Sequence, residues 1–303
     1  MNRLHDKKKY IADLSLLFVA AVWGGGFVAV KDALNTLTPM FLMTMRFVLA
    51  SIILYSFLHR KIGKVNKDDF KKGSIVGTIL FLAFAAQTYG LQFTTASKQG
   101  FLTATYVVIV PLLYWLLYRK PPKLKTFIGS FLTIVGIAFI SLESSLTLNI
   151  GDLLTLVCAV FFAAHIISIE YFAKDMNVYK LAFVQIFVAA IWCIVLAFMT
   201  EPIPASLSAR AWLAIVYLAT FSTFACFTIQ TIAQKYTSSS HASIILSLES
   251  VFAAVLGILI LEETMTSMIL LGCALIFIAI LIVEVDLDVI KNLKKHAPDK
   301  YNI

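Results

Sequence analysis

The chain has 303 residues, of which 60% are hydrophobic and only 14% are charged, and its mean hydropathy is +0.89. Soluble domains are nearer half apolar and a quarter charged, so this composition excludes a soluble globular protein. The net charge of +8 does not indicate a nucleic-acid partner, because most Lys and Arg residues lie in short breaks between apolar runs. There they act as topology signals. We therefore expect an all-α polytopic membrane protein.

Ten apolar segments are long enough to cross a bilayer as helices, which requires about 20 residues each. In chain order the predicted spans are residues 11–31, 37–58, 73–94, 99–118, 124–142, 152–172, 179–200, 210–234, 240–261 and 264–284. Most prolines lie at the breaks between these segments, where helices end. Pro111 lies inside the fourth predicted span, and we expect it to kink that helix.

Positive charges are distributed unevenly over the alternating loops of this arrangement. One side carries 21 of the 25 Lys and Arg residues, and the other carries only Lys31, Lys98 and Arg210, with Arg46 inside the second span. Because positive residues accumulate on the cytoplasmic side, we expect both termini in the cytoplasm. Lys31 and Asp32 are expected to be solvated at the outer edge.

The chain also resembles itself at a shift of 139 residues. The matched pairs are Asp13 and Asp152, Arg46 and Gln185, Pro111 and Ser250, and, after the register changes by four beyond the loop 119–125, Gly129 and Gly272. A five-helix unit used twice enters the membrane from opposite faces, which is the inverted-topology repeat of many secondary transporters. We expect a first repeat at residues 1–144, a second at 145–290 and a cytoplasmic tail at 291–303.

Four stretches of the sequence resemble a known family. They are AAVWGGGFVAVKDAL, TPMFLMTMRFVLAS, GDLLTLVCAVFFAAH and SLESVFAAVLGILILEETMTSMILLGCALI, and they are similar to helices one, two, six and nine-to-ten of the EamA family in the drug/metabolite transporter superfamily. The last signature usually reads Leu-Glu-Pro and later Gly-Glu. Glu249 and Glu263 match its acids, whereas Ser250 replaces the proline and Glu262 the glycine. Without that proline we expect the ninth span to be less kinked.

The resemblance implies ten helices in two inverted repeats around a central cavity, with the fifth and tenth helices more peripheral. It also implies a secondary transporter that exports or exchanges small metabolites such as amino acids by alternating access. The polar but mostly uncharged spans favour neutral or zwitterionic substrates. The lipid bilayer of the cell membrane is the expected environment, protons are a candidate coupling ion, and the oligomeric state stays open, although a monomer is competent in principle.

Other functional classes find less support in the sequence. An intramembrane enzyme would need a nucleophile and base or a metal set, and no HExxH, GxSxG or Walker motif is present. A receptor-like protein without transport activity remains an alternative, although the loops offer no long soluble sensing domain. The four cysteines lie in apolar runs and are interpreted as small apolar residues. We expect no enzyme, no cofactor, no catalytic residue and no metal ligand.

Ionisable side chains inside the spans are costly, so each is a candidate site residue. Glu249 lies deep in the ninth span, where it should be protonated or paired with a group on another helix. It could couple protons, contact a substrate amine or serve as a structural hydrogen-bonding carboxyl. Arg46 could snorkel outward, pair with an acid or bind a substrate carboxylate. His165, in the sixth span, could sense pH, contact substrate or simply pack.

Uncharged polar and aromatic side chains complete the predicted substrate-binding or coupling set. Trp23 and Tyr106 lie too deep for the interfacial aromatic belt, so we expect them to line the cavity with Gln87 and Gln230. The three glycines after Trp23 would allow either a flexible helix or close helix packing. The full candidate set is Trp23, Arg46, Gln87, Tyr106, His165, Gln230 and Glu249.

Overall fold

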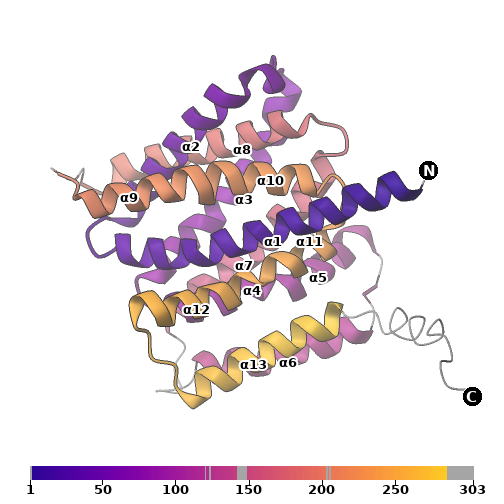
Figure 1. Cartoon of the computed structure of the whole chain (residues 1–303), viewed down its shortest axis with the longest axis vertical. Coiled ribbons are helices and arrows are strands. Elements are labelled where there is room, and N and C mark those ends of the chain that lie inside the picture. Colours follow the sequence, from indigo (N-terminus) through magenta and orange to yellow (C-terminus); the bar gives the residue numbers. More distant parts are fainter. Residues whose placement is uncertain are drawn as a thin grey trace, which may run out of the picture.

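The computed structural model describes residues 2–119, 121–122, 124–141, 149–202, 204 and 206–284, and every regular element within them is helical (Figure 1). Most helices lie side by side across the bundle. One element, η1, is a π-helical segment inside an otherwise α-helical stretch. In chain order the elements are α1 (Asn2–Ala33), α2 (Pro39–Ile62), α3 (Lys67–Leu91), α4 (Ala96–Ala104), α5 (Tyr106–Tyr118), α6 (Leu124–Ser141), α7 (Ile150–Phe172), α8 (Val178–Thr200), α9 (Ala209–Tyr217), η1 (Leu218–Ala225), α10 (Cys226–Ala233), α11 (Ser239–Ser247), α12 (Glu249–Leu261) and α13 (Ser267–Glu284).

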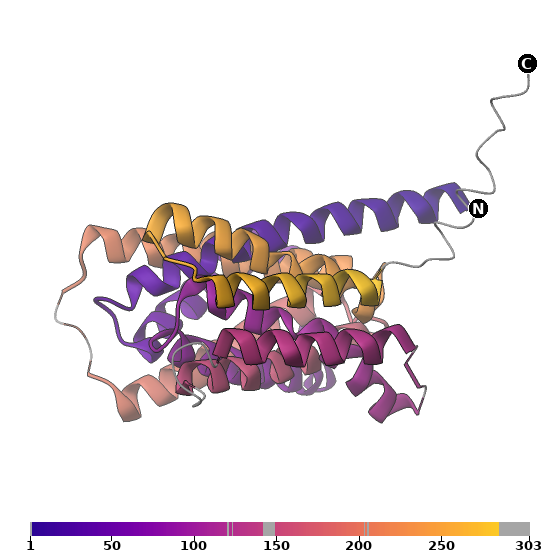
Figure 2. The same cartoon turned by 90° about the horizontal axis from the view of Figure 1, so that it is seen from below.

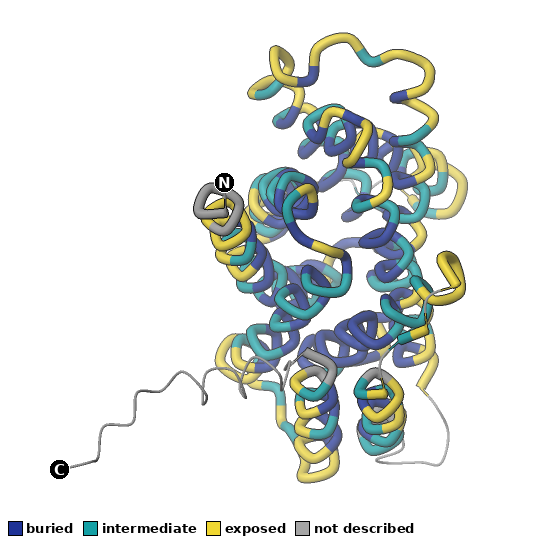
Figure 3. The backbone as a smooth tube through the Cα atoms, turned by 90° about the vertical axis from the view of Figure 1, so that its right-hand side faces the viewer, coloured by how far each residue is buried: buried dark blue, intermediate teal, exposed yellow. Residues whose placement is uncertain are grey.

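Eight helical stretches of the described chain are long and apolar enough to cross a membrane. Two shorter apolar stretches accompany them, Phe127–Gly136 in α6 and Ser267–Ala279 in α13. These two helices pack along one another at one edge of the bundle (Figures 2 and 3). Large apolar side chains such as Phe57 and Phe198 point outward, which a membrane protein tolerates because lipid tails are as apolar as the side chains themselves. The chain is thus a multi-pass helical membrane protein.

Two faces bound the bundle and are named here by the chain segments they carry. The N-terminal face, at the right of Figure 1, carries the start of α1 and the turns 63–66, 173–177 and 234–238. The opposite face carries the connections 34–38, 92–95 and 262–266 and the described residues 201–202 and 206–208.

Carboxylates from distant parts of the chain cap three helix N-termini, where backbone N–H groups have no partner within the helix. Glu201 accepts hydrogen bonds from the N–H groups of Met40 and Phe41 at the start of α2, at 3.1 and 3.0 Å. Glu263 caps α4 at the opposite face in the same way, and Glu170 caps α11 at the N-terminal face. These contacts fasten neighbouring helices to one another at both faces.

Two of the membrane-spanning stretches are interrupted near their middle. The backbone turns at Thr105 (φ −60°, ψ −15°) between α4 and α5, and at Leu248 (φ −62°, ψ −12°) between α11 and α12. The N–H of each residue donates to the carbonyl three positions earlier, at 3.3 Å in both cases. This is the tighter pattern of a 3₁₀ turn, so each span consists of two shorter helices.

Prolines do not mark the places where these two spans are interrupted. Helix α5 continues through Pro111, and the ninth span is interrupted in the same way although it contains no proline, so the prediction of a straighter ninth span is wrong. Hydroxyl groups near the turns give the physical reason. Thr105 Oγ1 and Ser250 Oγ donate to carbonyls three residues earlier, at 2.7 and 2.8 Å, and such local bonds compete with the helical pattern.

Helix lengths recur along the chain. Helices α4 and α11 each contain 9 residues, α5 and α12 each contain 13, and α6 and α13 each contain 18. Equivalent positions in these helices are 143 residues apart, so Tyr106 corresponds to Glu249 and Pro111 to Ala254 rather than Ser250. The register has therefore changed before α4, earlier than the loop where the sequence comparison placed it.

Lys31 and Asp32 are partly exposed, as expected for the outer edge, but both also have protein partners. Lys31 Nζ donates to the carbonyl oxygens of Leu91 and Thr94, at 2.8 and 2.7 Å, where it satisfies backbone acceptors near the end of α3. Asp32 accepts two hydrogen bonds of 2.7 Å from Arg210. Together these contacts tie the end of α1 to α3 and α9 at the opposite face.

Gly24 marks a close approach of α1 to α12. A Cβ atom there would collide with the Phe252 side chain and lie 2.9 Å from the Ala253 amide nitrogen. We expect Gly24→Ala to destabilise the fold by about 1–3 kcal/mol, the usual cost of overpacking, as a lower melting temperature of the purified protein in detergent. Gly26→Ala is the control. Its Cβ would approach only the Ser222 side chain, at 3.2 Å from the hydroxyl oxygen, so we expect a smaller loss of stability than in Gly24→Ala. Equal losses in the two variants would contradict a packing role for Gly24.

Candidate functional site

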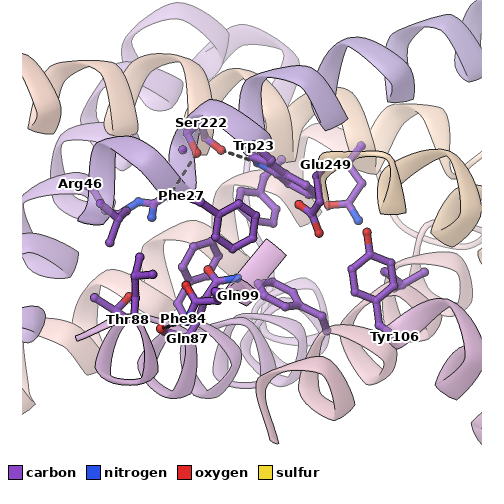
Figure 4. Close-up of a pocket in the computed structure, with 17 residues that line it drawn as sticks. Trp23, Phe27, Arg46, Phe84, Gln87, Thr88, Gln99, Tyr106, Ser222 and Glu249 are labelled. Atoms are coloured by element: carbon purple, nitrogen blue, oxygen red, sulfur yellow. Dashed lines mark hydrogen bonds between the residues drawn. The ribbon is translucent and has the colours of Figure 1, made fainter. Parts of the chain in front are cut away.

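A pocket lies at the centre of the bundle, among side chains from α1, α2, α3, α4, α5, α7, η1, α10 and α12 (Figure 4). It contains about 560 Å³ of empty space, part of it open to the surroundings, and side chains from both halves of the chain line it. The structure brings six of the seven predicted site residues to its wall. They are Trp23, Arg46, Gln87, Tyr106, Gln230 and Glu249.

Arg46 occupies one end of the pocket and is only 3% exposed. Its Nε donates to Thr223 Oγ1 at 2.9 Å and its Nη2 to Ser222 Oγ at 3.1 Å. The guanidinium carbon lies 4.5 Å from the ring centroid of Phe84, a cation–π contact. Arg46 therefore does not snorkel outward, and no carboxylate of the described chain pairs with it. Neutral hydroxyls and an aromatic ring hold its positive charge in the pocket.

Glu249 lies at the other end of the pocket, where the Tyr106 hydroxyl points toward its carboxyl group (Figure 4). Within the described residues, no basic side chain forms an ion pair with Glu249. Tyr106 is the first residue of α5 and Glu249 the first of α12. The two helix interruptions therefore deliver both polar groups to the same place, from equivalent positions in the chain.

Aromatic rings form the wall between these two ends. The ring centroids of Trp23 and Phe227 are 5.0 Å apart, those of Phe84 and Phe162 5.4 Å, and those of Phe84 and Phe227 5.7 Å. Trp23 Nε1 also donates to the Ser222 carbonyl in η1, at 2.8 Å. Such π-helical segments occur frequently at functional sites, and here the same residue contacts both Trp23 and Arg46.

Amide side chains add neutral polar groups to the pocket. Gln99 Nε2 donates to the Gln87 carbonyl at 2.7 Å and to Thr155 Oγ1 at 3.2 Å. The side-chain oxygens of Gln99 and Gln230 have no hydrogen-bond partner among the described residues. Because buried polar atoms are normally satisfied, these oxygens are available to hydrogen-bond donors of a ligand or of water.

Sequence reasoning missed several residues of this wall. Gln99 carried a usable signal, since it is a polar residue at the start of an uncharged apolar run. Phe162 also carried one, because the shift of 139 residues matches it with Trp23. The wall residues Phe27, Phe84 and Phe227 carried none, because the chain contains 24 phenylalanines and their spacing does not separate those of the pocket from those facing lipid.

His165 lies outside the pocket and is fully buried. Its Nε2 is 2.8 Å from Gln185 Oε1, and its ring centroid is 5.7 Å from that of Phe227. Phe227 lines the pocket, so His165 lies against an aromatic residue of the wall without itself reaching the cavity in this conformation.

A multi-pass helical fold around a buried, aromatic-walled pocket with ionisable groups at its two ends suits a membrane transporter. The model of the EamA-like transporter family matches residues 10–142 and again residues 149–285. The chain belongs to this family, as the sequence motifs indicated, and the proteins related to it are named as transporters rather than enzymes.

Individual relatives agree with this assignment. An "uncharacterized transporter" of Archaeoglobus fulgidus is 38% identical over 277 residues, which cover 91% of this chain and 87% of that protein. The "uncharacterized transporter YoaV" of Bacillus subtilis is 25% identical over 272 residues, 87% of this chain and 93% of the relative. A solved crystal structure shares the fold, with a TM-score of 0.68 and 13% identity over 95% of this chain and 99% of the other.

Proposed function

We propose that this transporter exports or exchanges small zwitterionic metabolites, foremost amino acids with a large apolar side chain, by alternating access. One observation carries the proposal: Arg46 and Glu249 lie at opposite ends of a single aromatic-walled pocket (Figure 4). A substrate that carries a carboxylate, an ammonium group and an apolar side chain has a complementary partner for each part.

The chemistry of each contact follows from the groups present. The hydrogen bonds of Arg46 to described residues use Nε and Nη2, so Nη1 is available to a substrate carboxylate, with which guanidinium forms strong charge-assisted bonds. An ionised Glu249 carboxylate would accept hydrogen bonds from an ammonium group. The rings of Trp23, Phe84 and Phe227 would bury an apolar side chain, which contributes about 25 cal/mol per Å² of apolar surface removed from water.

Alternating access requires two conformations of similar energy, and a duplicated fold supplies them. We infer ten membrane helices in two inverted five-helix repeats, at residues 1–144 and 145–290. The matching helix lengths and the two separate matches to the family model support this inference. Residues 142–148, at the junction, and the tail 291–303 lie outside the described residues.

The orientation inferred from positive charges places the N-terminal face in the cytoplasm and the protein in the cell membrane. In a cysteine-free background, a single cysteine at Asn35 should react with a membrane-impermeant thiol reagent added outside intact cells. A single cysteine at Lys64, which is also exposed but at the N-terminal face, should react only after the cells are permeabilised. The reverse pattern would overturn the orientation, and labelling of both sites from outside would indicate dual topology.

Counterflow in proteoliposomes tests the proposed substrate class. Vesicles preloaded with unlabelled L-phenylalanine should accumulate external radiolabelled L-phenylalanine or L-leucine. Phenethylamine and 3-phenylpropionate, which each lack one of the two charges, should compete more weakly because each leaves one end of the pocket unpaired. A phosphorylated sugar should not compete. Absence of counterflow across a panel of apolar amino acids, with protein that is folded and inserted, would refute the proposal and favour the receptor-like alternative.

A further inference from the structure

A chain of hydrogen bonds beside the pocket determines which ring nitrogen of His165 carries the proton. Thr231 Oγ1 donates to the Phe227 carbonyl at 2.6 Å, so it accepts from Gln185 Nε2, at 2.9 Å. The Gln185 amide is thereby oriented with Oε1 toward His165 Nε2, at 2.8 Å. An amide oxygen only accepts, so Nε2 carries the proton and, in the neutral ring, Nδ1 is a bare acceptor.

The Nδ1 atom of His165 has no partner among the described residues, although the side chain is fully buried. A buried acceptor without a donor costs free energy, so its retention needs an explanation. The Phe227 ring lies against the imidazole in a T-shaped contact and also lines the pocket. His165 is therefore a polar group placed behind a single aromatic side chain of the substrate pocket.

The positions of His165 and Gln185 in the duplicated fold indicate in which conformation of the transporter they would line the pocket. His165 corresponds to Gly26 and Gln185 to Arg46, because the first two helices of the two halves are related by a shift of 139 residues. Gly26 and Arg46 line the pocket in this conformation. If the halves exchange conformations, His165 and Gln185 come to line it from the side of the N-terminal face.

We propose that His165 and Gln185 form a second substrate subsite, on the N-terminal-face side of Phe227, in which His165 Nδ1 accepts a hydrogen bond from the substrate's ammonium group. The proposal rests on the alternating access put forward above. The counterpart of the Arg46 guanidinium here is the neutral Gln185 amide, so this subsite recognises the amine end of the substrate and offers no cation to the carboxylate.

Polar contacts join the helices that lie between His165 and the N-terminal face. Gln234 Nε2 and Ser239 Oγ both donate to the carbonyl of Ile166, the neighbour of His165, at 3.0 and 3.2 Å. Glu170 accepts from the Ser239 N–H at 2.8 Å and caps α11. These bonds join α7 to the end of α10 and to α11, so we expect them to break when the subsite opens to that face.

Diethyl pyrocarbonate, which acylates neutral imidazole nitrogens, tests whether His165 becomes accessible when this face opens. The rate of labelling is measured at His165 by peptide-resolved mass spectrometry, with the exposed His59 as the internal standard. We expect slow labelling in the wild type and about fivefold faster labelling in Glu170→Gln, because a neutral amide replaces the charged cap of α11 and weakens its charge-assisted bond to the Ser239 N–H. If Glu170→Gln does not yield folded protein, Gln234→Met, which removes the bond to Ile166, takes its place.

Glu263→Gln is the matched control, because Glu263 caps α4 at the opposite face. Its labelling rate at His165 should remain at the wild-type value. In Glu170→Gln, phenethylamine should slow the labelling and 3-phenylpropionate should not, since only the first carries an ammonium group.

The possible outcomes separate this subsite from the proposed transport function. Equal labelling in Glu170→Gln and Glu263→Gln would overturn the subsite, whatever transport assays show. Faster labelling in Glu170→Gln without protection by phenethylamine would overturn the recognition of the amine. Both expected results in a protein that transports no amino acid would support the subsite and refute the proposed substrate class.

Discussion

Replacing Glu249 with glutamine is expected to preserve the fold and to reduce transport by roughly 10- to 100-fold, the effect of losing a hydrogen bond to a charged group. Glutamine matches glutamate in shape and keeps a hydrogen-bonding side chain beside Tyr106, but it cannot ionise. Glu249→Asp should retain partial activity, because the carboxyl group remains and is withdrawn by one methylene. Tyr106→Phe should weaken transport less than Glu249→Gln, since it removes only a neutral neighbour of the carboxyl group.

Two assays in proteoliposomes separate the possible roles of Glu249. If the carboxylate holds the substrate amine, Glu249→Gln should impair both counterflow and uptake driven by an imposed pH gradient. If it carries a coupling proton, counterflow should persist and only gradient-driven uptake should fail. The matched control is Glu262→Gln, which removes an exposed carboxylate and should leave both assays unchanged. Full activity of Glu249→Gln in both assays would assign the residue a structural role.

Replacing Arg46 should have the second large effect, on the carboxylate end of the substrate. Arg46→Gln is expected to weaken L-phenylalanine binding by roughly 10- to 100-fold, because a charge-assisted bond in a buried site is lost. Arg46→Lys should recover part of the affinity, since an ammonium group restores the charge but not the planar, bidentate geometry. Binding is measured by isothermal titration calorimetry on purified protein.

Analogues that lack one charge show which end of the substrate Arg46 contacts. Affinity for 3-phenylpropionate should fall in Arg46→Gln, whereas affinity for phenethylamine should be almost unchanged, and Glu249→Gln should show the reverse. Arg210→Gln serves as the control, because Arg210 is an exposed surface residue that pairs with Asp32, and such pairs contribute little. Equal losses for both analogues in Arg46→Gln would indicate general disruption of the pocket rather than recognition of the carboxylate.

The order of substrate contact also bears on the direction of transport. Arg46 and Glu249 can engage both charged ends of a zwitterion in the present conformation, whereas the proposed second subsite contains a neutral amide in place of the guanidinium. We therefore expect the two conformations to bind the same substrate with different affinities. Substrate affinities measured separately on the two sides of oriented vesicles would quantify this difference.

The sequence by itself determined the class of protein and the position of the eight described helical stretches that are long and apolar enough to cross a membrane. Apolar length is a local property, because a bilayer of fixed thickness requires about 20 consecutive apolar residues wherever a helix crosses it. The sequence also selected most of the candidate site residues, since a charged or strongly polar side chain such as Arg46 or Glu249 is costly inside a membrane unless something offsets the cost. Six of the seven candidates line one pocket.

Only the tertiary structure decided which of these residues lie close together and which hydrogen-bond partners each of them has. Arg46 is held by Ser222 and Thr223, which are 176 and 177 residues away in the chain, and helical periodicity carries no information about such partners. The interruptions at Thr105 and Leu248 could not be predicted from proline positions, because neither turn lies at a proline. Hydroxyl groups that donate to nearby backbone carbonyls accompany both turns instead. The aromatic wall was equally hidden, since a phenylalanine facing lipid and one facing the pocket have the same local sequence environment. His165 differs from the other candidates for the same reason: its neighbours in space, Gln185 and Phe227, direct it behind the wall rather than into the cavity.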